Sequence, residues 1–278
     1  MNKVRPEDLS KTWDEMAEIW ENLPSRSPNR IIEHFHGRVE NFIVEMFSDD
    51  IGPDSKNVLD LGCGDGKLLR HMKNSYFSVL SDLFSKALKK EELIYLAYDT
   101  TFFGVDISRE MLKRAEERTK GSAVFYVTDK LPEFKRKMKE RPQFRFVEYD
   151  LRNGTPFKKE GNFDYVMITG NTIGNIESPS VLLKYTYKIL KSLGCLIIGS
   201  YNPKFMTEQF VNSYYRRLPS QIELLSFNPQ EHTVYFDLEG LFSKWYSKEE
   251  LSELLRGAGF DNYRIKQEGI GFLTVATK

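Results

Sequence analysis

Short apolar runs alternate with longer segments of helical periodicity along most of the chain. Runs typical of buried strands lie at residues 57–61, 98–106, 144–149, 163–168, 195–201 and 271–276. Between them, apolar residues recur every three or four positions, as at Leu69, Met72, Tyr76, Val79, Leu83 and Ala87. Strands that alternate with helices predict an α/β fold built on a parallel sheet.

The first strand ends in a turn with three glycines, Asp60-Leu61-Gly62-Cys63-Gly64-Asp65-Gly66. Glycines let the backbone take conformations that other residues resist, so that a ligand can lie against the main chain. A dinucleotide-binding turn would need a third glycine at position 67, where this chain has Lys67. Although such a turn can be purely structural, its spacing resembles motif I of the class I S-adenosylmethionine-dependent methyltransferases.

This resemblance covers about residues 55–278 and implies both a fold and a cofactor. The fold would be a doubly wound, seven-stranded, mostly parallel sheet with an antiparallel last strand, decorated by a helical N-terminal cap and by insertions. The cofactor would be S-adenosyl-L-methionine, with S-adenosyl-L-homocysteine as its product. In motif I, the resemblance assigns cofactor contacts to Asp60, Gly62, Cys63 and Gly64.

An acidic residue, Asp106, ends the second predicted strand, and Ser108 is a plausible cap for the helix that follows. A carboxylate at this place can accept hydrogen bonds from both ribose hydroxyls. The alternative is an ordinary helix-capping acid. By the resemblance, Ile107 and Met111 would pack near the adenine.

Asp150 and Leu151 follow the third strand of the family pattern. By the resemblance, Asp150 accepts a hydrogen bond from the adenine amino group, while the Leu151 backbone meets a ring nitrogen. Asp129 is a rival, since Val124 to Asp129 also has a strand pattern. Asp150 is preferred because the next strand begins soon afterwards at Phe163 and leads to Thr169, another expected cofactor contact.

The segment Gly170-Asn171-Thr172-Ile173-Gly174-Asn175 follows the fourth family strand, where ligands of doubly wound sheets bind. It resembles short segments of glycine N-methyltransferase-like enzymes and of histidine N-alpha-methyltransferase. Asn171 is the predicted catalytic residue, because an asparagine can orient an acceptor's lone pair, although asparagines also stabilise turns. The Asn-Pro-Pro-aromatic signature of many enzymes that methylate nucleobase or glutamine amide nitrogens is absent.

We expect a helical N-terminal cap at residues 1–55 and a methyltransferase domain at 56–278, with insertions at about 72–97, 121–143 and 203–231. The first insertion follows from arithmetic: Gly66 and Asp106 are 106 − 66 = 40 positions apart, about twice the roughly 20 expected. In the cap, Trp13, Trp20 or Arg30 could face the pocket or anchor a helix. The third insertion predicts paired strands at 221–227 and 233–238, which would help to recognise the substrate.

Charge and composition limit the partners. With 40 basic and 40 acidic residues, no overall charge steers the protein toward nucleic acid or an anionic membrane. The stretch from Lys130 to Arg145 is basic and keeps RNA contact as an alternative, but its apolar residues at helical spacing favour a solvated helix face.

A polar N-terminus and the lack of a long apolar run predict a soluble, cytoplasmic protein without a membrane anchor. The two cysteines, Cys63 and Cys195, suit buried fillers. The pair His34 and His36 lacks a nearby cluster of further ligands, so no metal site is expected.

The predicted activity is direct transfer of a methyl group from S-adenosylmethionine to a nitrogen or oxygen atom of a small molecule. The four histidines, His34, His36, His71 and His232, are the only neutral-range candidates for a base. An RNA-modifying methyltransferase and a non-catalytic module that binds the cofactor stay open as alternatives. An aminopropyltransferase is disfavoured, because Thr169-Gly170-Asn171 stands where a further acidic pair would be expected.

Overall fold

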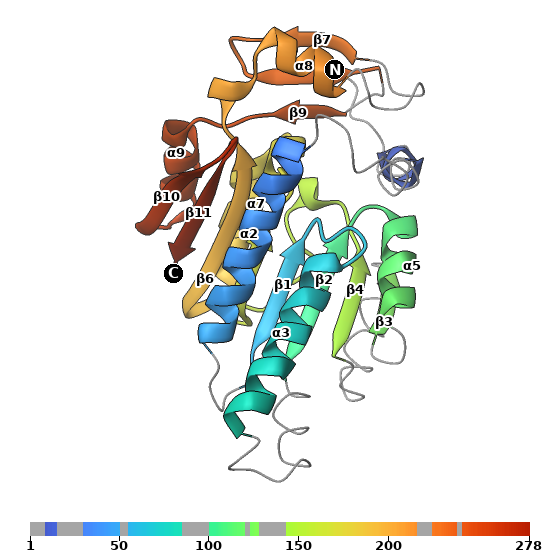
Figure 1. The fold of residues 1–278 in the computed structure, drawn as a ribbon, viewed down its shortest axis with the longest axis vertical. Helices are drawn as coiled ribbons and strands as arrows, with labels where there is room; N and C mark the ends of the chain where they lie inside the picture. The colour runs from blue at the N-terminus through green and yellow to red at the C-terminus, as the bar shows by residue number, and fades with distance from the viewer. Residues whose placement is uncertain are drawn as a thin grey trace.

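The computed structural model describes residues 9–15, 30–50, 55–84, 100–119, 123–127, 143–215, 224–237 and 241–278. A central sheet lies between two layers of helices, and a smaller sheet lies beyond one end of it (Figure 1). This arrangement is the predicted doubly wound α/β class.

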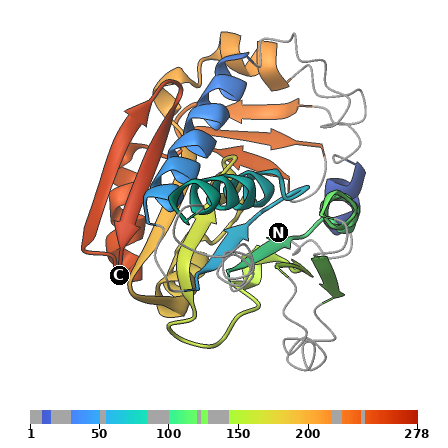
Figure 2. The ribbon, with the colours of Figure 1, turned by 60° about the horizontal axis from the view of Figure 1, so that its bottom comes forward.

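The described residues of the large sheet form eight strands in the order β10-β11-β6-β5-β1-β2-β4-β3. Their bounds are β1 (Asn57–Leu61), β2 (Thr101–Asp106), β3 (Ala123–Val127), β4 (Phe144–Glu148), β5 (Phe163–Ile168), β6 (Leu190–Tyr201), β10 (Asn262–Glu268) and β11 (Gly271–Thr277). Strand β11 is antiparallel to both of its neighbours, as expected of the last strand, and all other pairs are parallel. The red pair β10 and β11 forms one edge of the sheet in Figure 2.

The eighth strand, β3, extends the seven-stranded pattern at the opposite edge. It pairs in parallel with β4 and falls within the second predicted insertion. The position of β3 confirms the strand pattern that begins at Val124. Asp129, the alternative to Asp150 as the adenine-binding acid, lies outside the described residues. Asp150 follows β4, the strand next to β2, as the family pattern implies.

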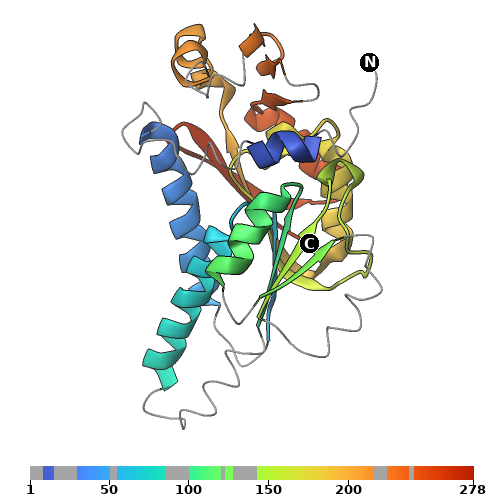
Figure 3. The ribbon, with the colours of Figure 1, turned by 90° about the vertical axis from the view of Figure 1, so that its right-hand side faces the viewer.

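Two hydrophobic cores cover the two faces of the large sheet. The first lies under α2 (Arg30–Asp49), α3 (Lys67–Phe84) and α5 (Arg109–Arg118), and the second under α7 (Pro179–Ile189) and α9 (Lys248–Ala258). Figure 3 shows α2 and α3 on one side of the sheet and α7 on the other. Helix α2 buries a residue every three or four positions, namely Ile32, Phe35, Val39, Ile43 and Phe47.

The small sheet contains β7 (Leu224–Asn228), β8 (Thr233–Phe236) and β9 (Phe242–Lys244), in that order and antiparallel. The pairing of β7 with β8 confirms the predicted hairpin. Helix α8 (Glu208–Tyr214) precedes it, and both lie above the upper ends of the large-sheet strands in Figure 1. Strand β9 packs against the short 3-10 turn η4 (Thr172–Asn175), which follows β5.

Other predictions differ in detail from the structure. The strand predicted at 195–201 begins earlier, at Leu190, which pairs with Phe163 of β5 and follows directly on the end of α7 at Ile189. The extended first helix is present as α3 to Phe84, and residues 85–97 of that insertion lie outside the described ranges. In the part of the chain that the structure describes, no helix is long and apolar enough to cross a membrane.

We predict that Phe47→Ala lowers the free energy of unfolding by about 3–5 kcal/mol, because it leaves a cavity in the first core. The Phe47 ring is 1% exposed, and its centroid lies 5.3 Å from that of Tyr76 and 5.5 Å from that of Tyr165. Urea unfolding measures the change. Ile31→Ala on the same helix is the control: that side chain is 58% exposed, so its loss should cost less than about 0.5 kcal/mol. Equal effects would contradict the assignment of α2 to the core.

Candidate functional site

Two cavities that share lining residues lie at the carboxyl ends of the central strands. The first, of about 230 Å³, is lined by eight of the predicted cofactor residues: Gly62, Gly64, Asp106, Ile107, Met111, Asp150, Leu151 and Thr169. The second, of about 430 Å³, shares Gly62, Met111 and Thr169 with the first and adds the remaining two, Asp60 and Cys63. The structure therefore brings all ten predicted cofactor residues to one place.

The glycine turn after β1 has a backbone that demands glycine. Gly62, Gly64 and Gly66 have φ values of 81°, 52° and 71°, in the left-handed region that side chains disfavour. A Cβ atom at Gly62 would also lie 2.5 Å from the Thr172 Oγ1 atom. The turn thus packs directly against the segment that follows β5.

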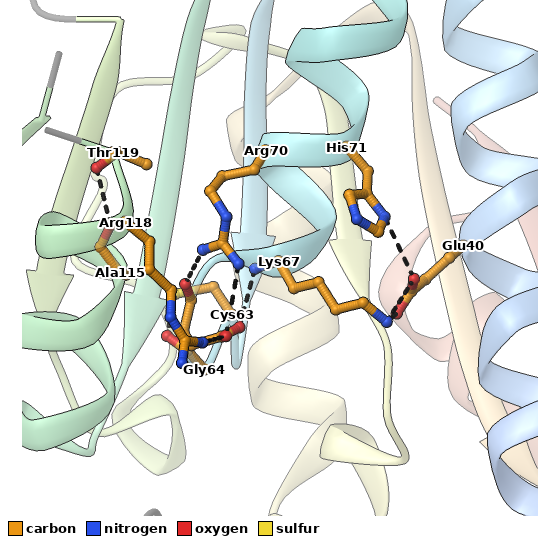
Figure 4. A network of polar contacts seen from close by, with 10 residues as sticks. Glu40, Cys63, Gly64, Lys67, Arg70, His71, Ala115, Arg118 and Thr119 are labelled. Atoms are coloured by element: carbon orange, nitrogen blue, oxygen red, sulfur yellow. Dashed lines mark hydrogen bonds and ion pairs between the residues drawn. The ribbon is translucent and has the colours of Figure 1, made fainter. Parts of the chain in front are cut away.

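Ion pairs attach this turn to the helices beside it (Figure 4). The Asp65 carboxylate accepts a hydrogen bond from the Lys67 amide at 3.0 Å and pairs with Arg70 and with Arg118 of α5. On the other side, Lys67 pairs with Glu40 of α2 at 3.1 Å. Exposed pairs of this kind each stabilise a fold by less than about 1 kcal/mol, but a network of them fixes the position of the turn.

The Asp106 carboxylate joins the ends of β1 and β2. It accepts hydrogen bonds from the Gly64 amide at 2.8 Å and from the Ser108 amide at 2.9 Å. Burial raises the pKa of Asp106, and these amide hydrogen bonds oppose the rise. Ser108 is also the predicted cap, because its side chain accepts from the Met111 amide. Asp106 also lines the first cavity.

The helical segment at residues 9–15 forms a wall of the first cavity. Its residues Leu9 and Trp13 line the cavity. Asp14 accepts hydrogen bonds from the Ser108 hydroxyl at 2.7 Å and from the Glu110 amide at 3.0 Å, which attaches the segment to the start of α5. Of the other cap residues predicted to face the pocket, Arg30 lines neither cavity, and Trp20 lies outside the described residues.

Asp150 caps the 3-10 turn η3 (Leu151–Asn153) and forms a forked ion pair with Arg152. The Arg152 Nε atom lies 2.9 Å from Asp150 Oδ2, and the Nη2 atom lies 2.7 Å from the same oxygen. Both residues line the first cavity. The sequence pattern identified the acid but not its arginine partner.

Asp60 is a buried carboxylate without an ion-pair partner among the described residues. It is 2% exposed, and its Oδ1 atom has no hydrogen-bond partner in the part of the chain that the structure describes. Burial, together with the nearby charges of Asp106 and Glu40, raises its pKa to about 8. An ammonium group placed beside Asp60 would supply the missing partner. This is the chemistry of the amino-acid end of S-adenosylmethionine, and the residues present therefore fit that cofactor.

The two cysteines are not suited to nucleophilic chemistry. Burial, followed by the charges of Asp106 and Asp60, raises the pKa of the Cys63 thiol well above its usual value. Burial also raises the pKa of Cys195 to about 12. Cys63 packs against Gly104, where an added Cβ would lie 2.7 Å from its sulfur. Among the described residues, no group of three histidine, cysteine or acidic side chains could hold a metal ion.

Asn171, the predicted catalytic residue, does not line either cavity. It is 2% exposed, and its amide nitrogen donates to Ser243 Oγ at 3.3 Å and to the Lys244 carbonyl at 3.2 Å. Its amide oxygen accepts from the Tyr201 backbone at 3.1 Å. The side chain is therefore committed to joining the ends of β5, β6 and β9, and the prediction of a pocket-facing role disagrees with the structure.

The asparagine that does line the first cavity is Asn175, four positions further along the same segment. Thr172 and Arg152 also line this cavity and were missed. His36 lines the second cavity, and its Nε2 atom lies 2.8 Å from the Tyr201 hydroxyl oxygen. Burial and then the charge of Lys67 lower the pKa of His36 to about 4, so this imidazole is neutral at neutral pH. The sequence named His36 among four histidines without distinguishing it.

Comparison with known proteins adds to this geometry. A family profile described as a methyltransferase domain matches residues 31–265. A curated relative is the ubiquinone/menaquinone biosynthesis C-methyltransferase UbiE of Desulfotalea psychrophila. The two are 25% identical over 242 residues, which are 86% of this chain and 78% of that protein.

Two solved structures have a similar fold. The 1,6-didemethyltoxoflavin-N1-methyltransferase of Burkholderia thailandensis, bound to 1,6-didemethyltoxoflavin and S-adenosylhomocysteine, matches with a TM-score of 0.53 and 12% identity over 100% of this chain and 92% of that one. An S-adenosylmethionine-dependent methyltransferase of Mesorhizobium loti matches with a TM-score of 0.51 and 12% identity over 88% of this chain and all of that one. At these identities the likeness concerns the fold.

We predict that Asn171→Ala lowers the free energy of unfolding by at least about 2 kcal/mol, because it leaves buried hydrogen-bonding groups unsatisfied. The matched control is Asn175→Ala in the same segment, where a cavity-lining side chain is removed and stability should change by less than about 0.5 kcal/mol. Urea unfolding of both variants is the measurement. An Asn171→Ala protein as stable as the wild type would contradict the structural role of these hydrogen bonds.

Proposed function

Because the chain belongs to the methyltransferase domain family, we propose that it passes a methyl group from S-adenosylmethionine to a nitrogen or oxygen atom of a small molecule. It is a class I, S-adenosylmethionine-dependent methyltransferase in fold and activity. The observation that carries the proposal is the convergence of Asp60, Asp106 and Asp150 on two cavities with shared walls.

The three carboxylates match three parts of the cofactor. Asp106 would accept from the ribose hydroxyls, and Asp150 would accept from the adenine amino group. Asp60 would face the ammonium of the amino-acid end. The side chains of Ile107, Met111 and Leu151 would pack against the adenine faces, while the backbones of Gly62 and Gly64 allow close approach. Thr169 lines both cavities and so stands between the nucleoside and the amino-acid end.

The chemistry needs alignment more than acid or base strength. S-adenosylmethionine supplies a methyl group already activated by its sulfonium, and the electron pair of the breaking carbon–sulfur bond stays on sulfur. The protein contributes position: a rigid glycine turn on one side and the turn η4 on the other hold the reacting atoms in line. The helical segment at residues 9–15 would exclude water from the nucleoside side.

The acceptor would bind near η4, where Thr172 and Asn175 line the first cavity. The Asn175 amide can accept a hydrogen bond from an amine or donate one to an oxygen, which orients the attacking lone pair. His36 lines the adjoining cavity and is neutral at neutral pH, so its imidazole can accept a hydrogen bond from the acceptor, but a pKa of about 4 makes it a weak base. The Tyr201 hydroxyl would orient its ring.

A carbon acceptor is the second candidate, and the similarity to a C-methyltransferase favours it. The structure offers less support for RNA. Arg145, the last residue of the basic stretch, is only 3% exposed, and its guanidinium lies 5.6 Å from the Phe103 ring centroid. Residues 128–142, which hold the rest of that stretch, lie outside the described ranges. A non-catalytic module would bind the cofactor in the same way as the proposed enzyme but would transfer no methyl group.

A screen with methyl-labelled S-adenosylmethionine and pooled small molecules tests the proposed activity. We expect label on a nitrogen or oxygen of one acceptor class, located by NMR of the product. Asp106→Ala should weaken S-adenosylhomocysteine binding at least about 100-fold, because two hydrogen bonds to a charged group are lost. Asp106→Asn, which keeps the size of the side chain, checks that folding is intact.

The exposed Asp261→Ala is the control for charge and should bind normally. A product methylated on carbon would favour the second candidate. A folded wild type that binds cofactor but transfers no label to any acceptor would favour the non-catalytic module.

Cofactor binding at pH 7 should release close to one proton, because Asp60 is protonated below its pKa of about 8 and must ionise beside an ammonium. Affinity for S-adenosylmethionine should therefore rise as the pH increases toward 8. Calorimetry in two buffers with different ionisation enthalpies counts the protons. Asp60→Asn should abolish the release, and 5′-methylthioadenosine, which lacks the ammonium, should release none from the wild type. Equal release by wild type and Asp60→Asn would refute this role.

A further inference from the structure

Arg152 occupies most of the hydrogen-bonding capacity of the Asp150 carboxylate. The Arg152 backbone amide donates to Asp150 Oδ1 at 2.9 Å. The Arg152 Nε atom lies 3.0 Å from Oδ1 and 2.9 Å from Oδ2, and Nη2 donates to Oδ2 at 2.7 Å. An ionised carboxylate has about four lone-pair sites. The four contacts come from three N–H groups, because the Nε–H is shared between the two oxygens, and three donors leave room for about one more.

The ion pair is also shielded from solvent. The Arg152 side chain is 16% exposed and that of Asp150 is 10% exposed, so the fork is screened less than a surface pair. A guanidinium is planar and permanently charged, and it holds a carboxylate by two parallel bonds. The carboxylate is thus fixed in rotation and balanced in charge, while both residues line the first cavity.

We propose that Arg152 is a positioning residue that sets the nucleobase selectivity of the cofactor site, by leaving Asp150 one fixed acceptor position. The inference rests on the proposed placement of adenine at Asp150. Adenine presents an amino group there, and one of its protons matches a single acceptor. Hypoxanthine presents a carbonyl oxygen instead, which the fixed carboxylate repels.

Removal of the Arg152 side chain would weaken the preference for adenine over hypoxanthine. A carboxylate released from Arg152 can rotate, and it can then accept from the ring N–H that hypoxanthine carries beside its carbonyl. Selectivity for adenine should fall even where the carboxylate itself is intact. The simpler alternative is that the pair only braces the turn η3, in which case both nucleosides would lose affinity equally.

Calorimetric titration of the full chain with S-adenosylhomocysteine and S-inosylhomocysteine distinguishes the two. The wild type should prefer the adenine compound, and Arg152→Ala should reduce the ratio of the two dissociation constants by about tenfold or more. Arg152→Lys keeps the charge but not the planar fork, so its ratio should fall as well. Arg256→Ala, an exposed arginine on α9, is the matched control and should keep the wild-type ratio.

Other results would contradict either the role of Arg152 or the proposed function. An unchanged ratio in Arg152→Ala, with both affinities lowered alike, would overturn the inference and leave a brace. A wild-type ratio in Arg152→Lys would overturn the role of the fork in favour of charge alone. A folded wild type that binds neither compound would overturn the proposed function and this inference together, whereas the first two results leave the proposed function standing. Urea unfolding of each variant confirms that the chain is folded.

Discussion

Two backbone amides that donate to the Asp106 carboxylate hold the cofactor site together. One comes from Gly64 in the turn after β1, and the other comes from Ser108 at the start of α5. Parallel strands place their carboxyl ends side by side but do not fix the turns beyond them. A single side chain does that here, because its two oxygens bind both turns at once. The glycine turn, this side of the first cavity and the first residues of α5 depend on it.

This arrangement places negative charge in a buried region. Asp60 and Asp106 both have raised pKa values, and Asp106 contributes to the rise at Asp60. A buried carboxyl group that keeps its proton avoids the free-energy cost of a buried negative charge. A cofactor with a cationic end removes the need for that proton. The same carboxylates therefore favour a positively charged ligand in this pocket.

The sequence predicted the parts of the site that depend on local pattern. Glycine spacing and the acids that end strands identified Gly62, Gly64, Asp106 and Asp150, because backbone conformation and strand ends leave clear signals in a sequence. The fold class followed from the same alternation of strands and helices. The exact strand number did not, since β3 lies in an insertion that the seven-stranded family pattern does not include, although Val124 to Asp129 has a strand pattern.

Contacts between distant segments were not predictable in this way. Asn171 and Asn175 lie in one short segment and are chemically identical. Which of them faces the cavity is decided by Ser243 and Lys244, more than 70 positions later, whose groups bind Asn171. The partner of Asp150 is only two residues away, yet the pattern of a strand followed by an acid says nothing about the direction of the Arg152 side chain.

The helical segment at residues 9–15 forms part of the pocket but contributes no strand to the large sheet. Asp14 binds the start of α5 from outside the sheet, and Leu9 and Trp13 complete the cavity wall. None of these three belongs to the strands that form the large sheet. Loss of residues 9–15 would remove one side of the first cavity. A complete pocket therefore needs a segment that lies outside the strands of the large sheet.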